Sequence, residues 1–447
     1  AISIDTTHLG FWICVSYMIV ILALQCIRLI SDTPFFKFRS SINSLFVSNP
    51  IRKSRSFRCR EDDKMMIEPP LSSQKTSDYF GLCAGSNVIL ITLESVSTSY
   101  LKPYNPNGVE FKYFNQLAKT SWVSNYHICL SPNTNTSYFT LYQGNYFQTS
   151  AHHTSHLDIL KRHELTPLYL TTSPTTKNPR FMNSLGIDQV YFPDKSSTQT
   201  KRSDKAIFSD LLKRIAKEHS DKERLFLHLK NMQTHHPYTS LTAHKSSDPF
   251  ERYCLAVEEV DGMLPILMEE ISELIDLENT IIVYTADHGQ SFGEMHYRIH
   301  SNSIIQPQIN VPFLIHHPKL TSRKIAFSSH FDLIPTLYDL LGIHHSEQFI
   351  GNSLGLYDIP FSHVLFSETR CGNLPSCFGH INKERKILID ASLEKNTLLN
   401  LEDHVIESLS GKEREYHKQL LRRALYQRGL IDRPTQPLEW NNANKSE

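Results

Sequence analysis

The chain has 447 residues, which is long enough for one large domain with appendages. Its content of 40% hydrophobic and 21% charged residues is that of an ordinary globular protein and excludes an intrinsically disordered one. Lys and Arg together number 46, as do Asp and Glu, so no overall field of either sign attracts nucleic acid or an acidic partner. We therefore expect a globular protein without a nucleic-acid partner.

An apolar segment lies near the start of the sequence. Leu9–Ile27 runs for about 19 residues without a charge, close to the ~20 that a helix needs to span a bilayer. We expect a transmembrane anchor over residues 1–30 and a linker over residues 31–84. A signal peptide is the alternative, which the length of the apolar run and the lack of a small-residue cleavage site disfavour.

Beyond the linker, apolar runs alternate with helical stretches. The apolar runs are typical of strands buried on both faces of a parallel sheet and cover Asn87–Leu93, Leu168–Leu170, Leu225–Leu229 and Thr280–Thr285. The expected helices cover Asp204–His219, Arg252–Leu277 and Ser329–Gly342. This alternation predicts an α/β fold whose mostly parallel central sheet is sandwiched by helices.

The rest of the sequence is divided by its patterns. We expect the catalytic domain over residues 85–358, a small C-terminal α+β part of that domain over 359–435, and a tail over 436–447. The C-terminal part ends in a charged helix, Lys412–Arg428. Cys371 and Cys377 bracket a short loop, which suits a local disulfide in an oxidising compartment and equally suits two unpaired thiols.

Two of the expected strands end in residue types that bind metals. The first is followed by Glu94, and the run ending at Ala286 is followed by Asp287 and His288. Functional groups of open α/β sheets gather at the carboxyl ends of the strands. Singly, an acid at a strand end is often only a helix cap, but carboxylates and imidazole together suit zinc or manganese. The pattern indicates a metal site.

The segment around these ligands resembles a known superfamily. Residues 284–312 resemble the Asp-His-Gly segment of the alkaline phosphatase/sulfatase superfamily, as found in sulfatase-like hydrolases and in phosphoethanolamine and phosphoglycerol transferases. Residues 87–95 resemble the first strand of these enzymes, and the Leu-Glu-Ser form is closest to the phosphoglycerol (lipoteichoic-acid type) transferases. Ser329–Gly342 resembles the Asp-Leu-(Ile/Val)-Pro-Thr-Leu helix of sulfatases. The resemblance implies an alkaline phosphatase-like fold.

The resemblance also implies a nucleophile at a helix N-terminus after the first strand. Residues 131–138 fit that place, but the Cys/Ser-x-Pro-x-Arg motif of true sulfatases is missing around Cys129. The transferases use threonine instead. Thr134 is preferred because Ser137 and Gly144 follow it at the family spacing, whereas Thr136 fits the Thr-x-Thr form of phosphoethanolamine transferases. The alternative is that these Ser and Thr residues only cap the helix and have no catalytic role.

The same resemblance assigns the remaining site residues. His235 matches the family's histidine before a Pro-Tyr turn better than His236 does, and His300 matches the histidine downstream of Asp-His-Gly, with His296 as competitor. Both preferred histidines would bind the oxygens of the transferred group.

The metal implied by the resemblance is a divalent ion, zinc first, with manganese or magnesium as alternatives. It would be held by Glu94, Thr134, Asp287 and His288.

These features together imply a membrane enzyme. The expected reaction moves phosphoethanolamine or phosphoglycerol from a membrane lipid donor to an envelope glycan or lipid A-type acceptor through a phospho-threonine. The catalytic domain would then lie on the periplasmic, extracytoplasmic side of the cell inner (plasma) membrane. A sulfatase-like ester hydrolase using the same site is the main alternative, and an inactive membrane regulator that keeps the fold is the third.

Overall fold

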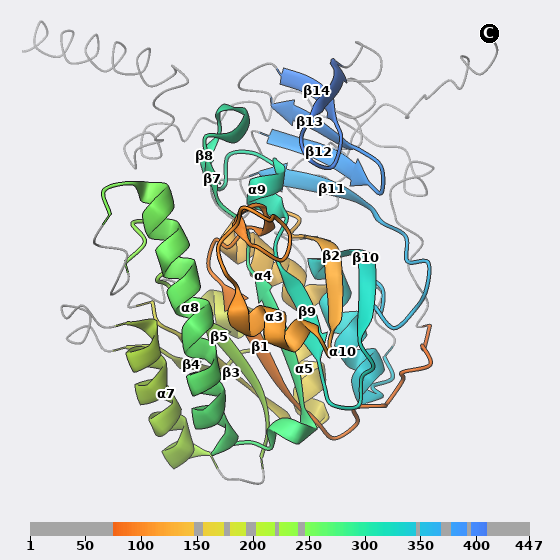
Figure 1. Cartoon of the computed structure of the whole chain (residues 1–447). Helices are drawn as coiled ribbons and strands as arrows, with labels where there is room; N and C mark the ends of the chain where they lie inside the picture. The colour runs from red at the N-terminus through yellow and green to blue at the C-terminus, as the bar shows by residue number, and fades with distance from the viewer. Residues whose placement is uncertain are drawn as a thin grey trace, which may run out of the picture. The chain divides into compact units, whose positions relative to one another are not determined.

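The computed structural model describes residues 75–146, 155–173, 179–193, 203–219, 223–239, 246–345, 349–367, 377–390 and 395–408 (Figure 1). The expected transmembrane segment, most of the expected linker, Cys371 and the expected helix Lys412–Arg428 lie outside these residues. Within the described ranges, no helix is both long and apolar enough to cross a bilayer.

An eight-stranded sheet forms the centre of the fold (Figure 1). Its strands are, in spatial order, β10 (Arg323–Ser329), β2 (Trp122–Ile128), β9 (Phe313–His316), β6 (Thr280–Ala286), β1 (Asn87–Leu93), β5 (Arg224–Lys230), β3 (Leu165–Thr171) and β4 (Gln189–Tyr191). Neighbouring strands are parallel except where β9 pairs with β2 and β6. The predicted α/β fold with a mostly parallel sheet is confirmed.

Helices cover both faces of this sheet, which explains why its central strands are apolar throughout. One face packs against α3 (Lys112–Ala118), α7 (Asp204–Glu218) and α8 (Pro249–Ser272). The other packs against α4 (Thr134–Gln143), α5 (His156–Arg162), α6 (Pro179–Ser184) and α10 (Leu333–Leu341). All seven residues of β1 and of β6 are buried between these layers.

The bounds of two expected helices can be compared with the structure. The helix expected over Arg252–Leu277 begins earlier and ends earlier, as α8. Its N-cap Asp248 accepts a hydrogen bond from the Phe250 N–H, and Pro249 occupies the first turn, where a missing N–H costs nothing. The expected cap at Gly342 ends α10 in a left-handed conformation, with φ of 71°.

A second sheet follows the catalytic core. It is an antiparallel meander of β11 (Ser362–Ser367), β12 (Cys377–Asn382), β13 (Lys386–Asp390), β14 (Lys395–Leu399) and β15 (Val405–Ser408). Figure 1 shows it beside the hairpin β7 (Ser291–Phe292) and β8 (Arg298–Ile299) and the short helix α9 (Gln306–Ile309). Cys377 at the start of β12 is a buried free thiol.

Residues 75–84, the part of the expected linker that the structure describes, pack against the core. The Gly81 N–H donates to the Asp339 carbonyl at 2.8 Å, and the Cys83 N–H donates to the Leu340 carbonyl at 2.8 Å. These bonds satisfy carbonyls at the end of α10, so residues 75–84 form part of the packed domain.

The N-terminus of α3 depends on an acid from another helix. Its own N-cap, Phe111, makes no side-chain cap. Asp261 of α8 instead accepts hydrogen bonds from the N–H groups of Tyr113 (2.8 Å) and Phe114 (3.1 Å) and from the Tyr284 hydroxyl (3.1 Å). This contact joins α3, α8 and β6 on one face of the sheet.

We expect Asp261→Ala to lower the free energy of unfolding by about 3 kcal/mol, because it strands three buried donors. Urea denaturation followed by circular dichroism measures the loss. Asp261→Asn keeps one acceptor oxygen and should lose clearly less; equal losses in the two variants would contradict the capping role.

Candidate active site

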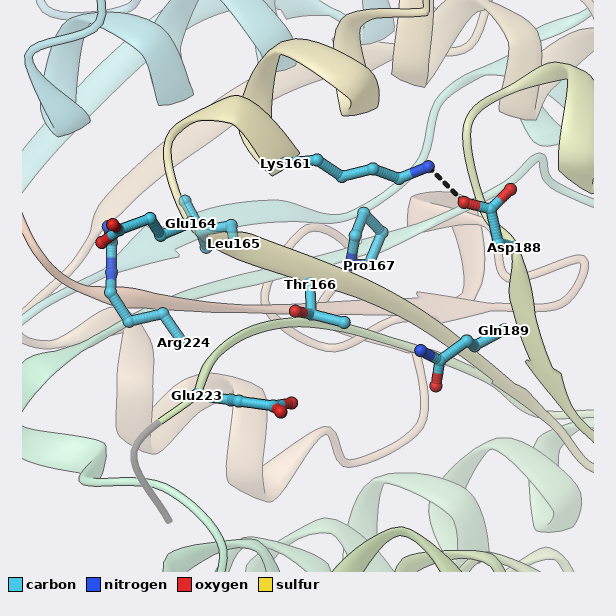
Figure 2. Close-up of a pocket in the computed structure, with 9 residues that line it drawn as sticks. All are labelled: Lys161, Glu164, Leu165, Thr166, Pro167, Asp188, Gln189, Glu223 and Arg224. Atoms are coloured by element: carbon cyan, nitrogen blue, oxygen red, sulfur yellow. Dashed lines mark hydrogen bonds and ion pairs between the residues drawn. The ribbon is translucent and has the colours of Figure 1, made fainter. Parts of the chain in front are cut away.

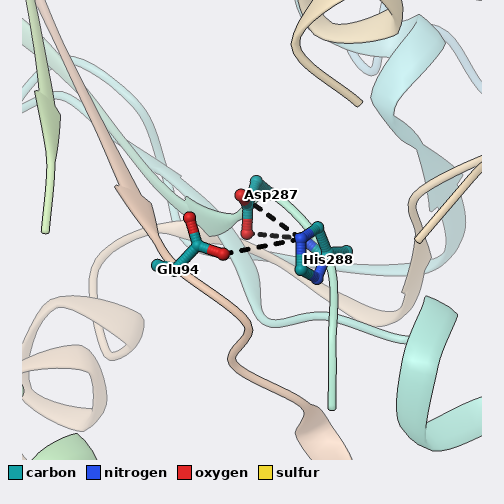
Figure 3. Close-up of side chains that lie close together, drawn as sticks. All are labelled: Glu94, Asp287 and His288. Atoms are coloured by element: carbon teal, nitrogen blue, oxygen red, sulfur yellow. Dashed lines mark hydrogen bonds and ion pairs between the residues drawn. The ribbon is translucent and has the colours of Figure 1, made fainter. Parts of the chain in front are cut away.

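The strand-end acids and histidine singled out by the sequence meet in one place (Figure 3). In the β1–β6 pair, Leu93 lies opposite Ala286, so the residues that follow the two strands emerge side by side. His288 Nε2 is 3.6 Å from Glu94 Oε1 and 3.6 Å from Asp287 Oδ2. One ligand atom from each residue falls within a 4.8 Å span, and all three side chains are buried.

Neighbouring polar groups hold the backbone of these ligands. Asp287 Oδ1 accepts hydrogen bonds from the N–H groups of Ser95 (3.0 Å) and His288 (2.8 Å). Asn231 Oδ1 accepts from the Glu94 N–H at 2.8 Å. A Cβ on Gly289 would lie 2.1 Å from the Pro307 carbonyl oxygen, so only glycine fits after His288.

The three side chains suit a divalent cation. His288 Nδ1 lies 3.0 Å from the Gly289 carbonyl oxygen, which only accepts, so Nδ1 carries a proton and Nε2 is the ring nitrogen that faces the carboxylates. Asp287 Oδ2 is buried and accepts no hydrogen bond from the residues that the structure describes. A buried carboxylate oxygen without a partner is a group that a bound cation satisfies.

The threonine preferred from the sequence lies at this cluster. Thr134 is the first residue of α4, and its Oγ1 is 3.1 Å from His288 Nε2. The free N–H groups and the dipole of a helix N-terminus favour an anion there. Thr136 is buried, and its hydroxyl contacts Asn133 Oδ1 at 3.5 Å. The structure therefore brings Thr134, rather than Thr136, to His288.

The sequence analysis missed Lys230, the last residue of β5. Its Nζ lies 2.6 Å from Glu94 Oε2, and both side chains are buried. Lys230 stands at the carboxyl end of a buried strand, as Glu94 does, so its position could have indicated it. Its residue type did not, because lysine is not a usual metal ligand. Lysine offers no ligand to a cation while it is protonated.

The charges of the cluster shift its pKa values. Burial opposes ionisation of Glu94, but the Lys230 ammonium and the nearby histidines more than offset it and hold the Glu94 pKa well below its usual range. Burial and the charge of Glu94 raise the pKa of Asp287 to about 6. Lys230 thus keeps one of the two neighbouring carboxylates ionised.

The two histidines preferred from the sequence lie next to the cluster. The His300 ring centroid is 4.3 Å from that of His288, and the His235 ring is 6.0 Å from His300. Burial, followed by the neighbouring His288, holds the pKa of His300 well below its usual range. The competing His236 and His296 are exposed.

Two features do not contribute to this site. Cys129 is fully buried, its thiol donates to the Gln308 carbonyl at 3.6 Å, and burial raises its pKa well above the usual range. A pocket of about 630 Å³ lies at the amino ends of β3, β4 and β5, opposite the end that carries Glu94 (Figure 2). Its Lys161 is paired with Asp158 and Asp188.

The chain is similar in sequence to several known proteins. The Sulfatase family model matches residues 86–343. Lipoteichoic acid synthase-like YvgJ of Bacillus subtilis is 27% identical over 310 residues, which cover 61% of this chain and 50% of that protein. Sulfatase ppz1 of Metarhizium majus is 27% identical over 110 residues, 24% of this chain and 26% of that protein. The chain thus spans about half the length of the Bacillus subtilis protein and about a quarter of the length of the Metarhizium majus protein.

A solved structure shows the same fold. It is a Vibrio parahaemolyticus protein of the alkaline phosphatase superfamily, with a TM-score of 0.61, 16% sequence identity and coverage of 82% of this chain and 93% of that one. The family match extends from the residue before β1 to the residue after Gly342, and so includes every strand of the central sheet. The chain belongs to the Sulfatase family.

Proposed function

We propose that this protein transfers a phospho-head group, phosphoethanolamine or phosphoglycerol, from a membrane lipid to an envelope glycan or lipid A-type acceptor. The observation that carries the proposal is the Thr134 hydroxyl, 3.1 Å from His288 Nε2 at the N-terminus of α4. Cys129, the cysteine nearest to it in sequence, is fully buried, and its thiol donates to the Gln308 carbonyl. The 310-residue match to a lipoteichoic acid synthase-like protein adds support.

A divalent ion, zinc first, would be held by Glu94, Asp287, His288 and Thr134, and when bound it would lower the pKa of the threonine hydroxyl. Thr134 Oγ attacks the phosphorus of the lipid head group, and the bond from phosphorus to the lipid alcohol oxygen breaks. The threonine proton leaves with the lipid alcohol. An acceptor hydroxyl then attacks the phospho-threonine and restores Thr134.

Other side chains serve the transferred group in this mechanism. The N–H groups at the start of α4 face the oxygens of the phospho-threonine. His235 and His300 bind the oxygens of the phosphoryl group from the other side. Lys230 adds a positive charge beside Glu94, which favours an anionic substrate in a buried site. An anchored enzyme whose catalytic domain is on the periplasmic side would meet such lipid donors in the membrane plane.

We expect a covalent adduct on Thr134. Full-length protein incubated with phosphatidylglycerol or phosphatidylethanolamine should gain the mass of the phospho-head group on the peptide containing residues 131–143, and Thr134→Ala should abolish it. Thr140→Ala, a buried threonine one and a half turns along α4, is the matched control and should keep the adduct. An adduct on Thr136 would overturn the assignment of the nucleophile. Turnover of a sulfate ester without any adduct would instead favour the hydrolase.

We expect the purified protein to hold about one equivalent of zinc or manganese, measured by elemental analysis. Asp287→Asn and His288→Ala should each lose most of it, because the first removes a negative charge from the ligand set and the second removes a ligand nitrogen. Chelation should lower the melting temperature of the wild type. Asp261→Asn changes a buried acid of α8 that is not part of the ligand cluster, so this variant should retain the metal. Full metal content in the Asp287 and His288 variants would rule out this site.

We expect Lys230→Met to lower kcat/KM by on the order of a hundredfold and to destabilise the fold by about 3–5 kcal/mol, because it leaves the buried Glu94 carboxylate without its partner. Lys230→Arg keeps the charge and should lose less of both. The double variant Glu94→Gln with Lys230→Met makes the pair neutral and should recover stability without activity. Recovery of activity as well would show that the pair is only structural.

A further inference from the structure

Left-handed backbone conformations at non-glycine residues gather around the site. Ser95, which follows Glu94, has φ of 61°. Ile299 and Ser301, which flank His300, have φ of 60° and 63°. Such conformations bring the Cβ of an L-residue close to its own carbonyl, and they persist only where the surroundings impose them.

Ile299 is the most unfavourable of these residues. It is branched at Cβ, and a branched residue at positive φ is a true outlier. Its side chain is 44% exposed, so burial does little to offset the strain. Glycine would adopt the same conformation without strain. A strained and exposed isoleucine next to a site histidine therefore needs another explanation than packing.

The segment Ile299–Ser301, which we call the His300 arm, is tied down on both sides. The Ser291 hydroxyl donates to the Ile299 carbonyl at 2.8 Å. The Ser301 hydroxyl donates to the Pro132 carbonyl at 2.6 Å, two residues before Thr134. The arm thus bridges the β7–β8 hairpin and the loop that leads into α4, whose first residue is the proposed nucleophile.

The histidine between these ties is itself oriented. His300 Nδ1 lies 2.9 Å from Gln290 Oε1, and Gln290 Nε2 donates to the Tyr238 hydroxyl at 3.0 Å. Tyr238 also has a left-handed backbone, with φ of 61°. The His300 ring is held 4.3 Å from the ring of His288 by this chain of contacts. Several strained residues and hydrogen bonds therefore converge on the position of one imidazole.

We propose that Ile299 and Ser301 are positioning residues, whose left-handed backbone holds the His300 imidazole against the phosphoryl-binding side of the site. The strain lowers the stability of the folded chain and narrows the range of positions open to His300. This inference rests on the proposed function for the identity of the substrate, but the restraint on His300 is independent of which ester reacts.

Glycine at position 299 would remove both the backbone strain and the restraint on His300. Loss of the strain should stabilise the fold, whereas loss of the restraint should slow the reaction. We expect Ile299→Gly to raise the melting temperature by about 1–3 °C and to lower kcat at least on the order of tenfold. Ile299→Ala keeps a Cβ and therefore much of the backbone strain, so it should raise the melting temperature less than Ile299→Gly does and lose much less kcat.

Glu164→Gly is the matched control. Glu164 has φ of 65°, is exposed, and lies at the amino end of β3 beside the remote pocket (Figure 2). It should raise the melting temperature by a similar amount with kcat unchanged. If Ile299→Gly keeps full kcat, or if Ile299→Ala loses as much kcat as the glycine variant, the positioning role of the strained backbone is wrong.

A second readout needs no turnover. Calorimetric titration of the full chain with inorganic phosphate should show about fivefold weaker binding in Ile299→Gly and wild-type binding in Glu164→Gly. If the wild type transfers no lipid head group, the proposed function is overturned. If Ile299→Gly nevertheless binds phosphate more weakly than the wild type, the positioning role is supported. Unchanged phosphate binding in an active transferase would overturn the positioning role alone.

Discussion

The parallel pairing of β1 with β6 is the constraint on which the rest of the site depends. Its register sets Leu93 opposite Ala286, so that Glu94 and the Asp287–His288 pair leave the sheet at the same level. Because side chains alternate along a strand, a shift by one residue would turn the apolar side chains of β1 to the other face. Both faces of β1 and β6 are buried, so such a shift would disturb close packing in both layers. The register that packs the core therefore also brings the site residues together.

The second constraint is electrostatic. Two carboxylates and the His288 imidazole are buried within a few ångströms, and such a group is unfavourable unless its charges are matched. The Lys230 ammonium offsets one carboxylate, and hydrogen bonds from the Ser95 and His288 N–H groups satisfy one oxygen of the other. The remaining oxygen, Asp287 Oδ2, is the part of the arrangement that a cation would complete.

The C-terminal sheet takes part in the same arrangement. The Tyr297 hydroxyl donates to Asp390 Oδ2 at 2.8 Å, and Lys386 Nζ donates to the Ile304 carbonyl at 3.0 Å. Both contacts hold the segment between β7 and α9, which includes His300. Residues beyond the matched family region therefore support a histidine within it.

The sequence by itself determined four of the eight strands of the central sheet (β1, β3, β5 and β6), the ends that carry Glu94 and Asp287–His288, and a threonine-rich helix start. These features depend on local patterns: apolar runs mark buried strands, and the residues after them mark the functional edge. Local pattern also misled, since the helix expected to continue to Leu277 ends at Ser272. Only the tertiary structure decided that Lys230 faces Glu94 and that Thr134, rather than Thr136, reaches His288. Those contacts join residues more than a hundred positions apart, and they depend on strand order and helix placement, which no local pattern encodes.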